Sequence, residues 1–186
     1  MTPTGIDRLR RGDNAGIGRH LRLIGLALCL SPGAAAAQTK GCDRVDFSDP
    51  PRSVLTCDSG FRITAEKGAA YTLIDDDRDG RPDAAELKSK ALLIEYPAAK
   101  RGGFQVRTPH AIASVRGTTW IVDAAPGGSA VFVQSGKVRV ARTGEPVGAV
   151  ALGAGDGVDV GPAGGPLAPK SWPRERRLHL LARFGR

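Results

Sequence analysis

The chain is poor in histidine, in aromatic residues and in long apolar runs. Of its 186 residues, three are histidines and 5% are aromatic. His110 and His179 stand far apart, without the neighbours of a histidine metal site or a catalytic triad, and no G-x-S-x-G, H-E-x-x-H or phosphate-loop motif is present. The few aromatic residues also disfavour a broad stacking platform for sugars, although Trp120 and Trp172 leave that use open. These absences indicate a protein that is not an enzyme.

Residues 1–37 have the pattern of a secretory signal. Arg19 and Arg22 precede the apolar run Leu23–Leu30, and Ala35–Ala37 supplies an A-x-A cleavage pattern. This run is well short of the ~20 apolar residues that a membrane-spanning helix requires. We therefore expect cleavage after Ala37, a mature chain without a transmembrane anchor, and a periplasmic location.

Cysteine is also scarce, with three in the whole chain. Loss of the leader removes Cys29 and leaves Cys42 and Cys57. In an oxidising compartment such a pair is expected to form a disulfide, whereas a metal pair would need further ligands nearby. Closing a loop of this length stabilises a fold by ~3 kcal/mol in the chain-entropy model.

The basic residues are concentrated at the end of the chain. The formal net charge is +8, and removal of a leader with five arginines and two aspartates leaves +5. No basic stripe is interleaved with stacking aromatics, so nucleic acid is not an expected partner. An envelope protein with an acidic surface, or a polysaccharide, suits this charge better. The surplus lies in Arg174, Arg176, Arg177, Arg183 and Arg186.

Runs of β-branched residues separated by turn signals predict an all-β domain. In 137–140, valines alternate with basic residues, which places the two kinds of side chain on opposite faces of a strand. Glycine- and proline-rich turns separate the runs at 126–128, 135–136, 144–146 and 153–155. Short strands at this spacing are typical of a sandwich, a barrel or a solenoid, and periodicity does not choose among them.

The C-terminal residues predict an amphipathic helix. Pro173 is suited to the first helical position, and Gly185 to the stop. Leu178, Leu181 and Ala182 fall on one face at helical spacing, so we expect the helix to cap an end or edge of the β-core.

The segment 75–86 fits the pattern D-x-D-x-D-G-x5-E. Calcium takes six to eight oxygen ligands, and acidic residues at these spacings can supply them. The flanking residues read as strands, so this is not an EF-hand, and it resembles the calcium loops found between strands of extracellular β-proteins. The alternative is a solvated acidic turn, for which Asp and Gly are natural residues. The expected calcium ligands are Asp75, Asp77, Asp79, Asp83 and Glu86, with the carbonyl of Arg81.

A series of four short motifs lies within residues 104–160. It comprises Thr108-Pro109-His110-Ala111, then Val115-Arg116-Gly117-Thr118, then a hairpin pattern around Gly136 and a V-x-L-x-x-G strand at 150–155. This set resembles the FecR family of bacterial envelope proteins, and the resemblance extends back to about residue 70. The family implies a short β-solenoid-like stack. Its members typically sit in the inner membrane and relay an outer-membrane signal to a cytoplasmic sigma factor.

Each signature residue is expected to be structural. Gly117 should allow close approach of a neighbouring backbone, or a bulge. Arg116 is expected to point inward and clamp the strands through carbonyls or a carboxylate, with ligand contact as the alternative. Trp120 is expected in the core or in an interface.

The sequence therefore predicts five segments and one main function. They are a signal peptide (1–37), a cysteine-containing, turn-rich segment (38–60), a FecR-like β-domain (61–160), a linker (161–172) and a basic helix (173–186). No cytoplasmic N-terminal domain or spanning helix is visible, so we expect a free-standing sensor or adaptor that binds a protein or envelope ligand without catalysis. The competing class is a calcium-stabilised structural or adhesion protein of the envelope.

Overall fold

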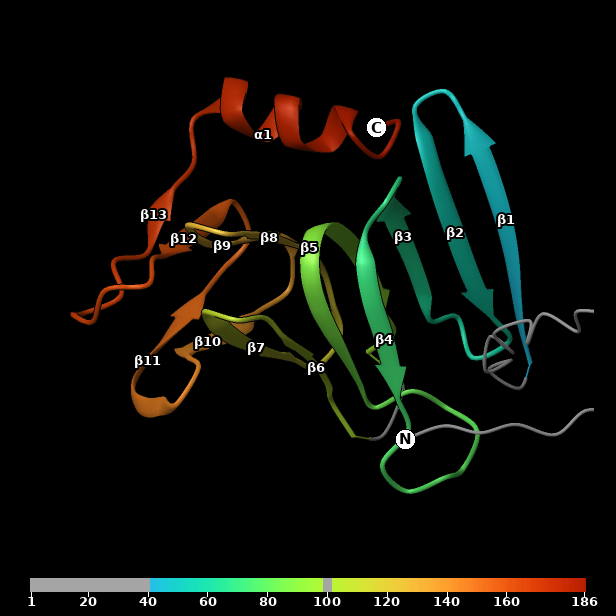
Figure 1. Cartoon of the computed structure of the whole chain (residues 1–186), viewed down its shortest axis with the longest axis horizontal. Helices are drawn as coiled ribbons and strands as arrows, with labels where there is room; N and C mark the ends of the chain where they lie inside the picture. The colour runs from blue at the N-terminus through green and yellow to red at the C-terminus, as the bar shows by residue number, and fades with distance from the viewer. Residues whose placement is uncertain (1–40, 99–101) are drawn as a thin grey trace, which may run out of the picture. The chain divides into compact units, whose positions relative to one another are not determined.

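The computed structural model describes residues 41–98 and 102–186, and the expected signal peptide lies outside them. The described part contains thirteen strands and one α-helix (Figure 1). In chain order they are β1 Cys42–Ser48, β2 Pro51–Cys57, β3 Arg62–Glu66, β4 Ala70–Ile74, β5 Ala84–Tyr96, β6 Phe104–Arg107, β7 Ala111–Val115, β8 Thr118–Ala125, β9 Gly128–Ser135, β10 Val138–Arg142, β11 Glu145–Leu152, β12 Asp156–Val160, β13 Lys170–Ser171 and α1 Arg174–Ala182.

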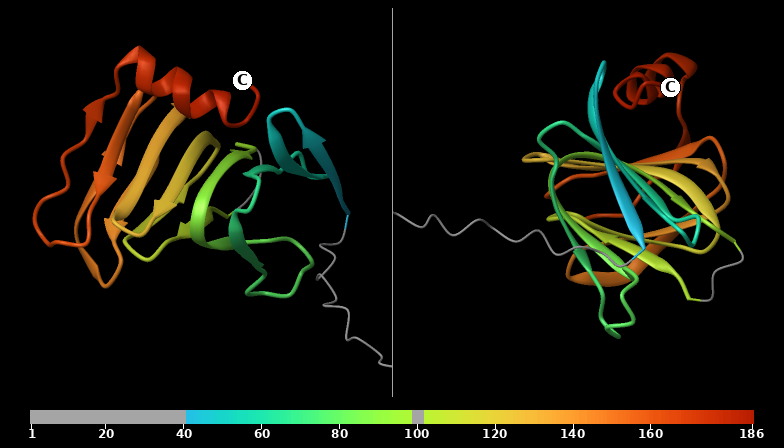
Figure 2. Two further views of the ribbon diagram at one scale, coloured as in Figure 1. Left: turned by 45° about the horizontal axis from the view of Figure 1, so that its top comes forward. Right: turned by 90° about the vertical axis from the view of Figure 1, so that its right-hand side faces the viewer.

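All thirteen strands belong to one sheet that curls into a half-barrel (Figure 2). The main path runs β11-β10-β7-β6-β5-β8-β9-β12-β13, and β1, β2, β3 and β4 join it through β5. β5 connects the two halves because its first residues pair with β4 and β6 while its later residues pair with β3 and β8. Between these parts Lys90 has φ of 68°, a left-handed conformation uncommon for a non-glycine residue, and it marks the change of partners along the strand.

The inner side of the curled sheet holds the main apolar core. Alternate residues of the strands point into it, as the burial of Val138 and Val140 on either side of exposed Arg139 illustrates. Trp120 is fully buried in this core. At one end of it, the rings of Phe61 and Phe104 lie 4.8 Å apart between centroids, with Tyr96 against both.

The opposite face of the sheet carries a second apolar cluster, and α1 covers it (Figure 1). Leu180 is the buried residue of the helix itself. Trp172 before the helix and Phe184 after it complete the contact with Ala91, Leu93, Ile121 and Phe132 of the strands. The helix thus packs on the outside of the half-barrel.

The all-β class and the C-terminal helix are confirmed, whereas solenoid or sandwich stacking is not confirmed. Residues expected to be polar and turn-rich around the cysteines instead form the hairpin β1–β2, and β2 pairs with β3 so that the hairpin extends the same sheet. The hairpin was missed because six of the seven β1 residues are exposed and therefore lack the apolar alternation of a core strand. Within the described residues, no helix is long and apolar enough to cross a membrane.

Candidate functional site

Thr108 of the signature is a buried hydrogen-bond centre. Its Oγ1 donates to the carbonyl of Ala111 at 3.0 Å and accepts the N–H groups of Ala111 at 2.8 Å and His110 at 3.2 Å. Ser129 Oγ donates to the same oxygen at 2.8 Å, and Thr143 Oγ1 donates to the Thr108 carbonyl at 2.9 Å. The hydroxyl therefore closes the turn before β7 and ties it to β9, a structural use of the motif.

Gly117 and Gly136 form two tightly packed corners where the chain passes between the halves of the sheet. Both have positive φ, 68° and 87°. A Cβ on Gly117 would lie 2.7 Å from Ala98 Cβ, and one on Gly136 would lie 2.6 Å from the carbonyl oxygen of Gly117. Thr118 Oγ1 donates to the carbonyl of Lys137 at 3.0 Å and holds the second corner against the first. The predicted close approach at Gly117 is present.

Arg116 does not point inward, and the expectation of a buried clamp is wrong. It lies in the turn between β7 and β8 and its side chain is exposed, while the preceding Val115 is buried. Pro109 is likewise exposed. The charge of Arg116 reaches Tyr96, where it opposes the burial that raises the pKa of that phenol. A turn position accounts for this exposure, because a charged side chain at a corner can remain solvated.

Three of the predicted calcium ligands converge in the loop between β4 and β5. One carboxylate oxygen each from Asp75, Asp77 and Asp83 lies within 4.8 Å of the others. Asp75 Oδ2 accepts the N–H of Gly80 at 2.8 Å, while Asp75 Oδ1 is buried and has no hydrogen-bond partner. Asp83 Oδ2 accepts the N–H of Asp76 at 3.2 Å. The loop thus gathers hard oxygen donors at one point.

The other two predicted carboxylate ligands, Asp79 and Glu86, do not join this group. Asp79 Oδ1 accepts the N–H of Arg81 at 2.7 Å, and its second oxygen lies 4.0 Å from the Arg81 guanidinium. Glu86 belongs to β5, exposed on the strand opposite Thr72. The EF-hand geometry is absent because the loop enters from one strand and leaves into another.

The disulfide between Cys42 and Cys57 is present and confirms the predicted pairing. It joins the start of β1 to the end of β2, where the two residues are register partners. The bond therefore closes the open end of the hairpin.

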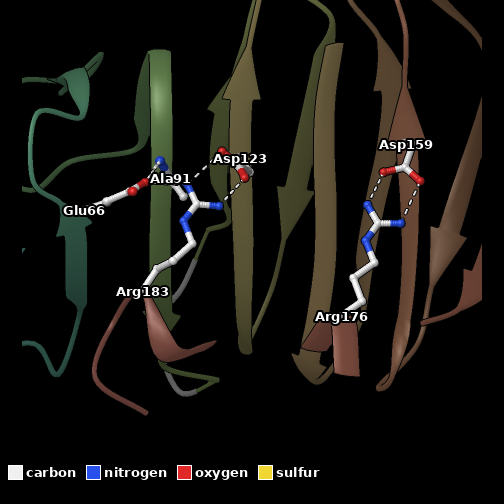
Figure 3. Close-up of polar contacts among 6 residues, drawn as sticks. All are labelled: Glu66, Ala91, Asp123, Asp159, Arg176 and Arg183. Carbon is white, nitrogen blue, oxygen red and sulfur yellow. Dashed lines mark hydrogen bonds and ion pairs between the residues drawn. The ribbon is translucent and has the colours of Figure 1, made fainter. Parts of the chain in front are cut away.

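The helix α1 is attached to the sheet by arginines that pair with carboxylates of four different strands. Arg183, just after the helix, contacts Glu66 of β3 and Asp123 of β8, and Arg176 makes a two-pronged contact with Asp159 of β12 at 3.0 and 2.5 Å (Figure 3). Arg186 pairs with Glu95 of β5 through one contact of 2.6 Å. Part of the basic surplus that was expected to suit an envelope protein or a polysaccharide is thus engaged within the chain.

These ion pairs shift the ionisation of their members. Hydrogen bonding from Arg176, and to a smaller extent from Lys170, holds the pKa of Asp159 below its ordinary value against the opposing effect of burial. Burial acts to lower the pKa of Arg183, but hydrogen bonds to Asp123 and Glu66 outweigh it and raise that pKa overall. Glu66 also accepts the backbone N–H of Ala91 at 3.3 Å. These ion pairs therefore hold α1 on the sheet and do not form an acid–base pair.

Trp172 seats the helix on β9 and β12. Its ring stacks on Phe132 with centroids 5.3 Å apart, and the Arg176 guanidinium lies 3.4 Å over the other face. Gly157 leaves the space for this ring, since a Cβ there would lie 2.3 Å from Trp172 Cε2. Sequence patterns did not predict this packing of Trp172 against the sheet. The signal available was a glycine within a strand, which often marks close approach of another group.

The two histidines of the described residues lie on separate elements. His110 lies in the turn before β7, and exposed His179 lies on α1. Within residues 41–98 and 102–186, the one group of three or more Asp, Glu, His or Cys side chains close enough to share a metal ion is the Asp75, Asp77 and Asp83 cluster.

Comparison with known proteins supports the resemblance drawn from the motifs. The family model "FecR protein" matches residues 60–139. Two crystal structures of a candidate anti-sigma factor from Parabacteroides distasonis, at 2.50 and 1.65 Å resolution, each align with a TM-score of 0.57 and 18% identity over 75% of this chain. The aligned part spans 64% of those chains, and the likeness shows a shared fold. Among curated proteins there is no match.

The family match begins earlier than the residues that first suggested it and ends earlier as well. It includes β3, the acidic loop and both glycine corners, and it stops inside β10 rather than at the end of β12. Taken with the buried Thr108 turn and the two packed corners, this match identifies residues 60–139 as a FecR domain.

Proposed function

We propose that this chain is an exported FecR-domain protein that acts in signalling at the cell envelope by binding a partner protein, and that it has no catalytic activity of its own. The observation that carries the proposal is the FecR match over residues 60–139. The aligned structures, described as those of a candidate anti-sigma factor, share the fold and favour a regulatory role over a chemical one.

The location of polar residues supports a binding role. The Thr108 hydroxyl is engaged in turn hydrogen bonds, and Thr118 Oγ1 is engaged at a corner, so these signature hydroxyls serve the scaffold. The Cys42–Cys57 bond suits an oxidising compartment such as the periplasm. A β-scaffold whose signature hydroxyls are used in its own turns is suited to recognition.

A capture experiment tests this proposal. The chain, tagged at its C-terminus and expressed in its bacterial host, is cross-linked in the envelope and recovered with whatever it holds. We expect a discrete protein partner that is absent when an unrelated exported domain carries the same tag. Recovery of polysaccharide without protein would instead support the structural or adhesion role.

The same material tests export. We expect the recovered protein to begin at Gln38, because the A-x-A pattern ends at Ala37. Mass spectrometry of the N-terminus measures this directly. Protein from the periplasmic fraction that retains Leu23–Leu30 would contradict cleavage.

A second candidate function is calcium-dependent stabilisation, favoured by the convergence of Asp75, Asp77 and Asp83. Their oxygens are the hard ligands that calcium prefers, and Asp75 Oδ1 is buried without a hydrogen-bond partner. These residues fit part of a calcium shell, with water and backbone carbonyls needed for the rest. Calcium bound there would join the two ends of the β4–β5 loop.

Calorimetry of chelator-treated protein tests this second function. At ten times its dissociation constant, calcium would stabilise the folded state by about 1.4 kcal/mol, and magnesium by less because its octahedral shell adapts poorly to such a loop. Asp77→Asn should abolish the response. Asp76→Asn should retain it, because Asp76 is equally exposed but its carboxylate lies outside the group. An unchanged melting temperature in millimolar calcium would identify the loop as an acidic turn.

A further inference from the structure

The sheet has four open edges in the described residues, and three of them are shielded against further pairing. β13 has two residues, β4 has a register shift at its start, and β11 has a register shift where it meets β10 together with Gly148 at φ of 86°. Short, bulged or irregular edges are the usual means by which proteins prevent strand addition. β1 is different, since its seven residues pair with β2 in one unbroken register.

β1 also exposes apolar side chains. Val45 is 54% exposed and Phe47 is 42% exposed, and these are two of the three large hydrophobic residues exposed in the described part of the chain. Both lie on the same face of the strand because side chains alternate. A regular edge with an apolar stripe has the properties of a strand that pairs with another strand.

The hydrogen-bonding pattern shows which backbone groups are available. The N–H of Asp58 donates to the carbonyl of Gly41 at 2.9 Å, which makes 41 and 58 a hydrogen-bonded pair of the antiparallel hairpin. Because such pairs alternate, residues 43, 45 and 47 bond to β2. The backbone groups of Arg44, Asp46 and Ser48 therefore point to the open edge.

The charges of β1 are complementary to a second copy of β1 in one register only. An antiparallel partner must pair outward-facing residues with outward-facing residues, so a two-fold axis passes through a residue of the strand. Centred on Arg44 or Asp46, the axis would oppose like charges. Centred on Val45, the axis places Arg44 of each copy opposite Asp46 of the other, which gives two attractive pairs. Val45 then lies opposite Val45 of the second copy, and all seven residues of β1 are paired.

We propose that β1 is a dimerisation strand, which pairs antiparallel with β1 of a second copy of this chain about a two-fold axis at Val45. Arg44 and Asp46 are 57% and 77% exposed and lie 3.7 Å apart within one copy, and Arg44 also donates to Ser53 Oγ at 3.0 Å. Both contacts are exposed, so the two side chains can exchange them for contacts across the axis at little cost. The same charges oppose pairing in the registers centred on Arg44 and on Asp46. The two sheets would join into one, and the Val45 and Phe47 side chains of both copies would form one apolar patch.

Charge reversal tests the partner and the register together. Arg44→Asp places Asp opposite Asp46 twice in the dimer, and Asp46→Arg places Arg opposite Arg44 twice. Each single variant should weaken dimerisation roughly 2- to 30-fold, from about 0.2–1 kcal/mol for each of the two cross-strand pairs that change from attraction to repulsion. Arg44→Asp with Asp46→Arg in one chain should restore it. A mixture of the two single variants should form heterodimers, because every pair across the axis is then attractive.

Sedimentation velocity of the protein as its host processes it, at concentrations up to about 1 mM, measures these associations. The matched control is Arg139→Asp, the same charge change at an exposed residue of an interior strand, which should dimerise like the wild type. Val45→Cys should oxidise to a covalent dimer, whereas Asp43→Cys, opposite Phe47 of the partner, should not. A monomer throughout this range, or a dimer indifferent to both charge reversals, would overturn the proposal.

Discussion

Arg183 should carry a large share of the energy that holds the C-terminal helix on the sheet. Replacing it with methionine keeps much of the aliphatic stem but removes the guanidinium from Glu66 and Asp123, two carboxylates that then face each other without a cation. Glu66 is also fixed by the N–H of Ala91, so it has little freedom to turn away.

The size of the effect follows from burial. An exposed ion pair is worth ~0–1 kcal/mol, and removing one partner of a fully buried pair costs about 3–5 kcal/mol. The Arg183 side chain is 24% exposed, with partners at 20% and 27%, so an intermediate loss of about 2–3 kcal/mol is expected. With a urea m-value of about 2 kcal/mol/M, the unfolding midpoint should fall by about 1–1.5 M.

Urea unfolding followed by circular dichroism measures this midpoint. Arg174→Met is the matched control, because Arg174 is exposed in the first turn, where a cation opposes the helix dipole, and its loss should leave the midpoint unchanged or slightly raised. Arg183→Met in a background of Glu66→Gln and Asp123→Asn should cost less than in the wild type. A midpoint shift no larger than that of the control would refute the assigned role of the ion cluster.

Three further predictions concern other parts of the fold. Gly157→Ala should lower stability by about 1–3 kcal/mol and change Trp172 fluorescence, because the new methyl group displaces the indole, while Gly161→Ala, with open space around it, should do neither. Arg116→Ala should change the free energy of unfolding by no more than about 0.5 kcal/mol, since the side chain is exposed; a large fall in the melting temperature would instead support a clamping role. The depressed pKa of Asp159 stabilises the fold above its ordinary value of 3.8, and that contribution is lost as the pH falls through the lower folded value. The difference in urea midpoint between wild type and Asp159→Asn should therefore be largest near neutral pH and should disappear as the pH falls below 3.8. A difference that does not change with pH would contradict this contribution of Asp159.

The strands of the core were predictable because their side chains alternate between water and the interior. Val138 and Val140 show this, and the glycine of the signature at 117 was correctly associated with close backbone approach. The β1–β2 hairpin was not predictable in the same way, because an exposed edge strand such as β1 needs no apolar period. Arg116 was misplaced for a related reason, since valine and glycine neighbours do not distinguish a strand interior from a corner.

The contacts of the candidate site were harder to predict than the strands, because they depend on how distant segments pack together. Arg183 and Glu66 are separated by 117 positions in the chain, and no local pattern indicates that they meet. The acidic loop was recognisable by the spacing of its carboxylates, but the spacing predicted more ligands than converge in the structure. Asp79 bonds within its own turn and Glu86 is held in β5, so three of the carboxylates converge.

The position of the helix has a consequence for what the half-barrel would expose without it. Ile121 and Phe132 are almost fully buried, and the residues that cover them, from Trp172 to Phe184, come later in the chain than the strands that carry them. When folding proceeds from the N-terminus, the half-barrel therefore forms with one apolar face still uncovered. That face is covered when Arg176 and Arg183 reach their carboxylate partners on the strands. A variant without residues 172–186 would therefore keep its strands but expose Ile121 and Phe132, which makes it prone to aggregation.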